Sequence, residues 1–357
     1  MKKKLCAVMI FLLTAVSAAG CEKKEEIKKY SHVDYAMGTV TNTTLYGKSQ
    51  DLDESEQELM QEMKKLETEQ LSWRKDSSSL AKLNQGDQTK AAVSEPLFSW
   101  LKKSLQIAAD SGGAADPAIG SLTRMWDFES NHPKAPDAQK LKELISEGVV
   151  NNAYEHVELD EKQKSVKKTA SVKFDLGAFG KGIGTDEAIK ILKKDKKVSG
   201  AMVALGGSIA VYGEKPDGEN WNVGIQNPNG KQGETIGGVR VKGGTFISTS
   251  GDYEKYFVDK KTGKRYFHIL DEKTGYPAKT YIRSCTIVCD SGIVSDGLST
   301  ACFVLGPEKS KPLLKKYGAK AIFVDKQKNV YVSEGLEFEL TDDAYKEMTF
   351  SAGSARQ

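Results

Sequence analysis

The feature that most limits the possible folds is a strand-like run that leads directly into a glycine-rich turn and then a helix. Residues 172–176 have the composition of a strand, residues 177–182 contain three glycines and Lys181, and a helical pattern follows from Ile183. Such a connection can point backbone N–H groups at an anion at the helix N-terminus. A tight strand–helix turn with a surface lysine gives the same pattern, so both interpretations stay open. The spacing matches neither the Walker loop nor Gly-x-Gly-x-x-Gly.

The remaining pattern predicts an α+β fold with mixed and antiparallel sheets and packed helices. Helical spacing of apolar residues predicts a helix over 52–71, and others follow Pro96 and cover 137–147, 294–305 and 308–316. Short strands are expected between them, among them 38–46, and the strands 156–160 and 165–168 flank a polar turn in a hairpin pattern. Hairpins interspersed with helices favour α+β over a doubly wound parallel sheet.

The first residues predict export and a lipid anchor. Three lysines precede an apolar run over 5–16, and small residues then lead to Cys21. This is the order of a secretory signal, and the residues before Cys21 are similar to a bacterial lipobox. The sequence therefore predicts a lipoprotein signal over 1–20, a lipidated Cys21 with a charged tether over 21–32, a catalytic domain over 33–345 and a C-terminal tail over 346–357. The alternative is a plain signal peptide with a chance cysteine.

Charge and cysteine content exclude some classes of function. The chain has 52 Lys and Arg against 49 Asp and Glu, and removal of residues 1–20 takes away three lysines, so 52 − 3 = 49 balances the acids. No basic block stands out, and nucleic-acid binding has no electrostatic support. The remaining Cys285, Cys289 and Cys302 are expected to be small buried hydrophobic residues.

Two further segments carry groups that can hold a metal ion or move a proton. Asp296 and Thr300 are four residues apart in a helical pattern and share a face, and an oxygen pair of this kind suits Mg²⁺. The alternative is a helix start capped by Ser295. His268 has Asp271 three residues further on and is a candidate general base, although a packed strand histidine would look the same.

Taken together, these segments resemble the bacterial FAD:protein FMN transferases, the ApbE family of flavin transferases. The resemblance covers about residues 37–332. It rests on nine ordered segments: Met37-Gly-Thr39, Ser72-Trp73, 80–84, 115–120 with Trp126, 175–182, 205–208, 248–256, 268–277 and 296–300.

The resemblance implies a T-fold-like, two-lobed catalytic unit with the FAD site between the lobes. It implies that Mg²⁺ is held by the side chains of Asp296 and Thr300 and the carbonyl of Ala178. The FAD contacts that it implies are Met37, Trp73, Ala115, Asp116, Pro117, Asp175, Lys181 and Ile269.

The chain departs from the family pattern at several positions. Phe267 stands where many members have a first histidine, and Asp271-Glu272 replaces Asp-Pro, which is expected to alter a turn rather than the chemistry. Ser208 replaces an asparagine, which puts any contact of that amide in doubt.

The implied reaction joins FMN from FAD to a threonine or serine of an acceptor protein and releases AMP. His268, with Asp271, is the expected base, and Lys181 with the backbone amides around 180–182 is expected to neutralise phosphate charge. The expected acceptors are flavoprotein subunits of membrane electron-transfer systems, reached from the extracytoplasmic face of the cytoplasmic membrane. An FAD pyrophosphatase and a non-catalytic flavin-binding lipoprotein remain alternatives.

Overall fold

The computed structural model describes residues 26–48, 50–85, 89–147, 150–169 and 171–351. The predicted signal sequence and the lipidation site at Cys21 lie outside these ranges. Within them, no helix has both the length and the apolar character needed to cross a membrane.

The helices follow the predicted apolar patterns closely. They are α1 (Leu52–Lys65), its π-helical continuation η1 (Leu66–Leu71), α2 (Ser79–Asn84), α3 (Glu95–Ser111), α4 (Gly120–Trp126), α5 (Ala138–Ser146), the 3₁₀ helix η2 (Ala153–His156), α6 (Gly180–Leu192) and α7 (Gly292–Lys316). The helix predicted over 52–71 is confirmed, with its last turns widened into a π-helix. The two helices predicted over 294–305 and 308–316 are the halves of α7, which bends at Gly306 where φ is 74°.

A nine-stranded sheet is the centre of the molecule. Its strands, in spatial order, are β1 (Lys28–Ala36), β2 (Thr39–Gly47), β6 (Val198–Leu205), β7 (Ser208–Gly213), β10 (Phe246–Gly251), β15 (Ile282–Cys289), β16 (Lys320–Asp325), β17 (Asn329–Ser333) and β19 (Lys346–Phe350). Only the β17–β19 pair is parallel. The mixed sheet and packed helices confirm the α+β prediction.

Four small sheets complete the fold. They contain β8 (Trp221–Gln226), β9 (Thr235–Val241) and β18 (Phe338–Leu340); β3 (Lys90–Ala92), β4 (Val157–Asp160) and β5 (Ser165–Lys168); β11 (Tyr256–Val258) and β12 (Arg265–Phe267); and β13 (Leu270–Asp271) and β14 (Tyr276–Pro277).

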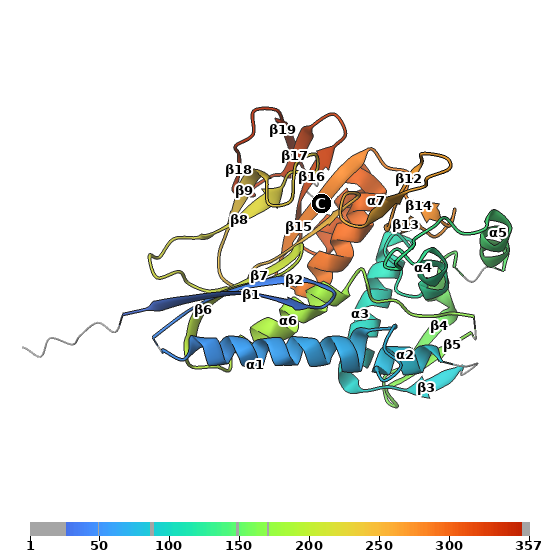
Figure 1. Cartoon of the computed structure of the whole chain (residues 1–357), viewed down its shortest axis with the longest axis horizontal. Helices are drawn as coiled ribbons and strands as arrows, with labels where there is room; N and C mark the ends of the chain where they lie inside the picture. The colour runs from blue at the N-terminus through green and yellow to red at the C-terminus, as the bar shows by residue number, and fades with distance from the viewer. Residues whose placement is uncertain (1–25, 49, 86–88, 148–149, 170, 352–357) are drawn as a thin grey trace, which may run out of the picture.

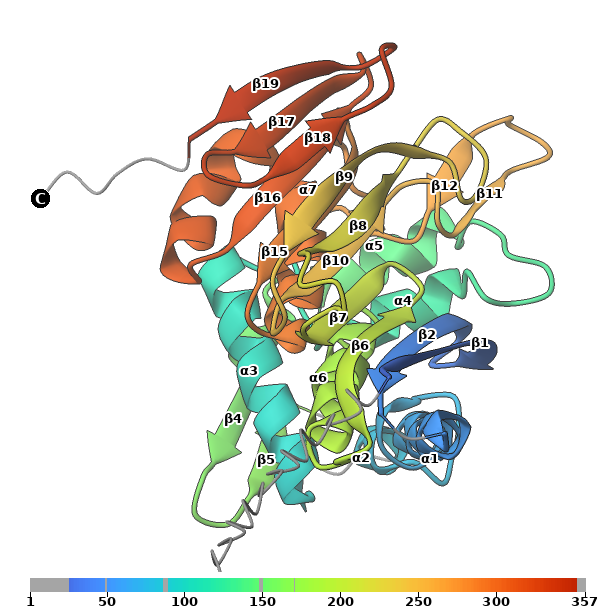
Figure 2. The same cartoon turned by 90° about the vertical axis from the view of Figure 1, so that its left-hand side faces the viewer.

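Two hydrophobic layers hold these elements together, one on each face of the large sheet. Helices α1, α6 and α7 cover one face, where buried residues such as Leu45, Ile183 and Phe303 form the main core. The sheet β18-β9-β8 covers the other face around Trp221 and Ile322. Figure 1 shows this small sheet to the left of β15–β17 and α7 to their right, and Figure 2 gives the perpendicular view.

The described fold extends beyond both predicted domain boundaries. Strand β1 begins at Lys28, inside the segment 21–32 that was expected to be a tether, because 28–36 pairs residue by residue with 39–47. Strand β19 occupies the start of the expected tail, where it pairs with β17 and buries Phe350.

The predicted strand over 172–176 is wrong. The segment belongs to no strand and makes only an isolated bridge, between Lys173 and Ile119. The buried side chain of Asn84 takes the place of a strand partner: its amide nitrogen donates to the Phe174 carbonyl at 2.7 Å, and its oxygen accepts the Phe174 N–H at 2.6 Å. A side chain that supplies both a donor and an acceptor can satisfy one residue of backbone as a neighbouring strand would.

We expect Asn84→Ala to destabilise the fold by about 2–4 kcal/mol, because it leaves a buried N–H and a buried carbonyl without partners. The midpoint and slope of urea unfolding measure this loss. The control is Asn42→Ala, since Asn42 is exposed on β2, and a change within about 0.5 kcal/mol is expected there. Equal losses in the two variants would contradict the role given to Asn84.

Candidate functional site

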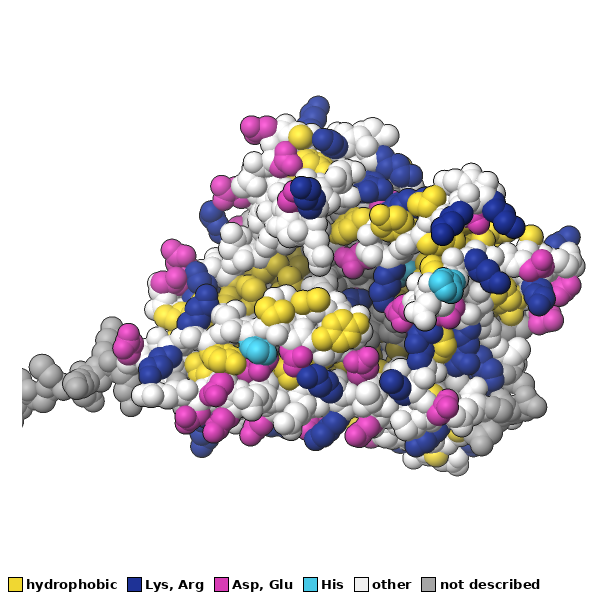
Figure 3. All heavy atoms as spheres, viewed as in Figure 1, with side chains coloured by type: hydrophobic (Ala, Val, Ile, Leu, Met, Phe, Trp, Pro, Cys, Tyr) yellow, Lys and Arg dark blue, Asp and Glu magenta, His cyan; other side chains and the backbone are white. Residues whose placement is uncertain are grey.

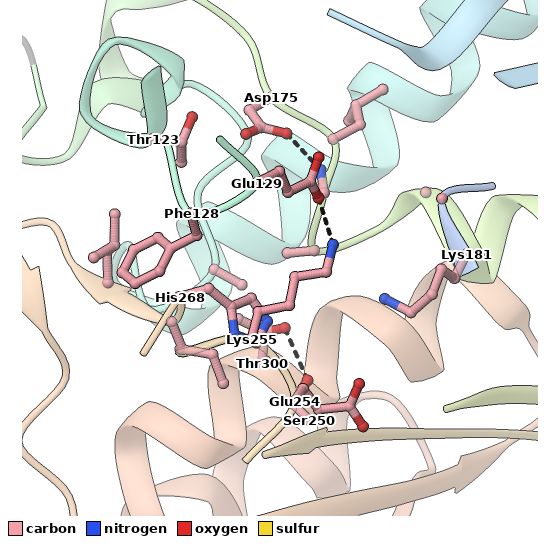
Figure 4. A pocket seen from close by; sticks show the side chains of 18 of the residues that line it. Thr123, Phe128, Glu129, Asp175, Lys181, Ser250, Glu254, Lys255, His268 and Thr300 are labelled. Carbon is pink, nitrogen blue, oxygen red and sulfur yellow. Dashed lines mark hydrogen bonds and ion pairs between the residues drawn. The ribbon is translucent and has the colours of Figure 1, made fainter. Parts of the chain in front are cut away.

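A cavity of about 340 Å³ lies where the β1–β2 turn, the end of η1, the segment after α3, the start of α6 and the base of the β11–β12 hairpin meet. Its walls come from segments far apart in the chain, and Figure 4 shows several of them from close by. Most of the predicted site residues line it: Met37, Trp73, Ala115, Asp116, Asp175, Ala178, Lys181, His268, Ile269 and Thr300. Most of the residues that the sequence predicted for one site therefore lie around one cavity.

The turn between β1 and β2 forms one wall of the cavity in a conformation that few residues adopt. Met37 and Gly38 have φ values of 55° and 67°, as in a two-residue hairpin turn in which both central residues are left-handed. A methionine pays a steric penalty there. Its N–H donates to Oε2 of Glu67 at 2.6 Å, which helps to hold the turn. Glu67 lies in the π-helix η1 and was missed, because nothing in the sequence marks a π-turn.

The glycine-rich segment serves helix packing more than anion binding. The N–H of Gly177 donates to Asp175 at 2.8 Å, that of Gly180 to Leu176 at 2.7 Å, and that of Gly182 to Asp296 at 2.9 Å. The expectation that the amides of Gly180 and Gly182 face a ligand is therefore wrong. A Cβ at Gly182 would lie 2.1 Å from the Gly292 carbonyl, so this glycine lets α6 and α7 approach each other.

Lys181 is the cationic side chain that this segment contributes to the cavity (Figure 4). Its amino group lies 3.8 Å from Oδ1 of Asp296. The carboxylate of Asp296 is only 2% exposed and also accepts the hydroxyl of Ser208 at 3.0 Å. A buried carboxylate needs such partners to offset its lost hydration. Ser208, which stands where the family pattern has an asparagine, thus supplies a hydroxyl to Asp296.

Hydroxyl groups continue from Asp296 along the contact between α7 and β10. Thr300 lies one turn further along α7, lines the cavity and contacts the hydroxyl of Ser250 at 3.1 Å. Ser250 also contacts Ser299 at 2.7 Å. Asp296 and Thr300 offer side-chain oxygens here, and the backbone of Ala178 lines the same cavity as Thr300. Oxygen groups of this kind suit Mg²⁺, which takes oxygen ligands and keeps several waters.

The described residues hold no group of three or more His, Cys, Asp and Glu side chains arranged for a metal ion. A metal ion near Asp296 would therefore need hydroxyl, carbonyl or water oxygens as its other ligands. Such a site differs from a zinc centre, which would need several nitrogen or sulfur ligands.

Two more cationic side chains lie at the cavity, and the motif analysis did not single them out. Lys255 forms an ion pair with Glu129, and Glu129 also accepts Nε of Arg74 at 3.1 Å. Figure 4 shows Lys255 extending into the cavity from near His268. Together with Lys181, these residues make the cavity suitable for an anion such as a diphosphate.

Trp73, the predicted flavin-packing residue, has two guanidinium groups close to its ring. Arg74 is 3.9 Å and Arg124 is 4.8 Å from its ring centroid. Both distances allow cation–π interactions, so this part of the cavity wall is ordered by contacts of its own.

His268 lies next to the cations. Burial, together with Lys255 and Lys181, lowers the pKa of His268 to about 3. Its Nδ1 is buried and has no hydrogen-bond partner among the described residues. The imidazole is therefore neutral at physiological pH and can accept a proton or a hydrogen bond, but the low pKa makes it a weak base.

Three of the predicted residues, Asp271, Pro117 and Asp296, do not line the cavity, and Asp296 is connected to it through its contact with Lys181. The carboxylate of Asp271 accepts the N–H of Lys273 at 2.9 Å within the β13–β14 turn, where it organises the turn rather than facing His268. Pro117 contributes its carbonyl to the N–H of Asp175 at 2.8 Å. Pro117 thereby helps to hold Asp175, which lines the cavity.

The sequence led us to expect that Glu272 alters only a turn, but its side chain also contacts a residue of the cavity wall. Its side chain is buried and lies against Asp116, which lines the cavity. Asp116 accepts the N–H groups of Ala118 and Tyr154, both at 2.8 Å. Burial and the charge of Asp116 raise the pKa of Glu272 to about 8. Glu272 is then the member of the pair that keeps its proton at neutral pH.

We expect Glu272→Gln to stabilise the protein relative to wild type increasingly as the pH rises from 5 to 8. A carboxyl whose pKa is raised on folding stabilises the native state below its unfolded pKa of about 4.5 and loses that contribution as the pH passes its folded pKa. Glutamine keeps a donor toward Asp116 and does not titrate. Thermal unfolding of both proteins between pH 5 and 8 measures the difference in Tm.

The control is Glu347→Gln, because Glu347 is exposed on β19. Its difference in Tm from wild type should stay nearly constant over the same range. A constant difference for Glu272→Gln as well would show that Glu272 titrates as an ordinary glutamate.

Comparisons with known proteins agree with this arrangement. The sequence model of the ApbE family matches residues 37–323. A protein of Treponema pallidum (strain Nichols) named FAD:protein FMN transferase is 31% identical over an alignment covering 92% of this chain and 93% of that protein. One of Haemophilus influenzae with the same name is 27% identical, with coverages of 97% and 99%. The crystal structure of an ApbE protein from Thermotoga maritima superposes with a TM-score of 0.74 at 30% identity, covering 88% of this chain and 97% of that chain.

Proposed function

We propose that this chain, which belongs to the ApbE family, transfers FMN from FAD to a threonine or serine hydroxyl of an acceptor protein and releases AMP. The relatives named FAD:protein FMN transferase, each aligned over most of its length, support the activity. The observation that carries the site assignment is the convergence of Lys181, Asp296 and Thr300 beside one cavity.

The reaction is a phosphoryl transfer. The acceptor oxygen forms a bond to the phosphorus on the FMN side, the bond from that phosphorus to the AMP oxygen breaks, and the hydroxyl proton leaves to a base or to water. Lys181 and Lys255 are the side chains placed to offset phosphate charge. Positioning and charge neutralisation supply most of the catalysis in such reactions, because the transition state is loose.

Asp296 and Thr300, with the Ala178 carbonyl, would hold Mg²⁺. When bound, the ion would supply positive charge that stabilises the charge developing on the leaving group. The residues fit, since their donors are oxygens and the Asp296 carboxylate is buried. Met37, Asp116, Asp175 and Ile269 line the space where the dinucleotide would lie.

His268 orients the acceptor hydroxyl as a hydrogen-bond acceptor in this proposal. Its low pKa favours orientation over full proton abstraction, and a loose transition state needs little help from a base. Asp271 is left without a direct role, since it lies in the β13–β14 turn.

The predicted lipid anchor places this activity outside the cytoplasm. Acylation of Cys21 would hold the enzyme at the extracytoplasmic face of the cytoplasmic membrane, near flavoprotein subunits of membrane electron-transfer systems. Metabolic labelling with a fatty acid, lost in Cys21→Ala, tests the anchor.

The direct test of function is incubation of the protein with FAD, MgCl₂ and a protein acceptor that the Haemophilus influenzae relative modifies, with that relative as the positive control. Flavin fluorescence that stays with the acceptor in a denaturing gel, together with AMP release, is expected. AMP release that needs no acceptor would instead identify an FAD pyrophosphatase. If neither a flavinylated acceptor nor AMP forms, the protein is a non-catalytic flavin-binding protein.

We expect Asp296→Asn to lower Mg²⁺-dependent AMP release on the order of 100-fold, because the variant removes the charge that would hold the ion. Asparagine keeps hydrogen-bonding groups for Gly182 and Ser208. Initial rates as a function of MgCl₂ concentration measure the loss, and thermal shifts with MgCl₂ alone measure binding without turnover.

The matched control is Asp186→Asn. Asp186 also accepts backbone N–H groups of α7, from Gly292 at 2.7 Å and Ile293 at 2.8 Å, whereas Asp296 is the carboxylate that contacts the cavity residue Lys181. The Asp186→Asn variant should be less stable than wild type and should keep the wild-type response to Mg²⁺. An Asp296→Asn variant with the wild-type response to Mg²⁺ would disprove the metal role.

We expect the pH profile of kcat/KM for FAD to show no inflection from His268 between pH 5 and 8. A histidine with a lowered pKa is already neutral throughout this range, so its protonation cannot switch activity there. His268→Asn should lower the rate and keep the shape of the profile. An inflection between pH 6 and 7 in the wild type that disappears in His268→Asn would contradict this assignment.

A further inference from the structure

Exposed apolar side chains concentrate on two hairpins beside the cavity. Among the described residues, eight large hydrophobic side chains are exposed, and five of these lie on the hairpins β1–β2 and β11–β12. The five are Val33 at 62%, Tyr35 at 61%, Val40 at 45%, and Tyr256 and Val258 both at 51% exposure. Grouped exposure of this kind marks an interaction site more often than single exposed residues do.

On the first hairpin the apolar residues share one face. Tyr35 pairs directly with Val40 across the two strands, and Val33 is two residues before Tyr35, so all three project to the same side. The opposite side of β1 is used for packing: Ala36 is buried, and Asp34 pairs with Lys64 of α1 at 2.7 Å. Val33, Tyr35 and Val40 therefore form a free apolar face.

This face is continuous with the catalytic cavity. The turn that joins β1 to β2 consists of residues 37 and 38, and both line the cavity, as does Thr39. Tyr35 and Val40 flank that turn directly, so whatever covers them lies at the cavity mouth. The left-handed turn fixes how the face leads into the cavity.

The second hairpin leaves the cavity in the same way. Lys255 and His268 line the cavity, and the strands between them carry Tyr256 and Val258, which are two residues apart and project to the same side of β11. The N–H of His268 donates to the Lys255 carbonyl at 3.0 Å, which closes the base of this hairpin at the cavity. Figure 3 shows apolar side chains gathered along β1–β2 and again near β11–β12.

We propose that the acceptor protein of the flavin transfer docks across these two hairpins. The proposal rests on the proposed function, in which a macromolecule must bring a hydroxyl to the cavity. Apolar residues that flank the reactive threonine or serine would cover Val33, Tyr35 and Val40 on one side and Tyr256 and Val258 on the other. The hydroxyl between them would enter past Met37 and Lys255.

An acceptor protein fits this surface better than a lipid bilayer. The apolar residues lie on two separate hairpins with the cavity opening between them, and a flat membrane that touched both would close the route for the acceptor. A segment of another protein can contact both hairpins and place one residue in the opening.

The test compares two hairpin variants with a matched control. One variant is Val33→Thr/Tyr35→Ser/Val40→Thr, the other is Tyr256→Ser/Val258→Thr, and the control is Tyr281→Ser/Met348→Thr. The control changes residues of similar exposure, 48% and 40%, that belong to neither hairpin and do not line the cavity. Threonine keeps strand propensity at the valine positions.

Flavinylation is measured as a function of acceptor concentration at saturating FAD and MgCl₂, with the acceptor protein used above. Each hairpin variant should raise the KM for the acceptor at least about tenfold, while kcat and the Kd for FAD stay near wild type and the control changes nothing. Circular dichroism and Tm establish that each variant is folded.

Three results would overturn the proposal. The first is an unchanged KM for the acceptor in both folded hairpin variants. The second is an equal rise in the control. The third is a loss of binding to vesicles of phosphatidylcholine and phosphatidylglycerol with an unchanged KM, which would make the surface a membrane contact. If wild type itself releases AMP but modifies no acceptor, the proposed transferase function has failed, which is a separate outcome.

Discussion

The structure depends on one buried contact, the carboxylate of Asp296 beneath the start of α6. Asp296 is on a helix that is buried on nearly every side, so its charge must be matched from within the protein. The N–H of Gly182 and the hydroxyl of Ser208 supply two hydrogen bonds, and Lys181 supplies the positive charge. These partners come from two separate segments, the start of α6 and the start of β7. A single carboxylate therefore fixes α6, α7 and the start of β7 relative to one another, and it does so at the edge of the cavity.

The same contact explains why small residues cluster there. The close approach of Gly182 to Gly292 leaves no space for a Cβ on either, and Asp186 accepts the first N–H groups of α7. The two helices thus start side by side, and Lys181 and Thr300 emerge from them toward the same space. Rigidity at this point matters because phosphoryl transfer relies on fixed charges rather than on moving ones. The same residues contribute to stability and to the proposed catalysis. Both stability and activity should therefore be measured for variants in this region.

The sequence could predict the elements whose signal is local. The apolar periodicity of 52–71, the hairpins and the bend of α7 at Gly306-Pro307 all follow from spacing and from the backbone preferences of glycine and proline. The sequence could also predict which segments lie together at the cavity, because the family resemblance assigns them to one site. It could not predict what replaces a strand at 172–176, since Asn84 is distant in sequence and acts through its side chain. Glu67 and Glu272 were missed for the same reason: their effect depends on a π-turn and on a buried neighbour that only the fold reveals.

The glycine segment shows why a correct motif can carry a partly wrong explanation. The interpretation as an anion cradle assumed that glycines expose amides to a ligand, whereas the amides of 177, 180 and 182 all bond within the protein. The anion-binding capacity instead resides in side chains, Lys181 on α6 and Lys255 at the base of the β11–β12 hairpin. A lysine can follow a phosphate whose charge shifts during the reaction, because its stem has several rotatable bonds, whereas a backbone amide in a packed turn cannot. The fixed part of this site is therefore the buried carboxylate of Asp296 with its partners, and the adjustable part is the pair of lysines that line the cavity.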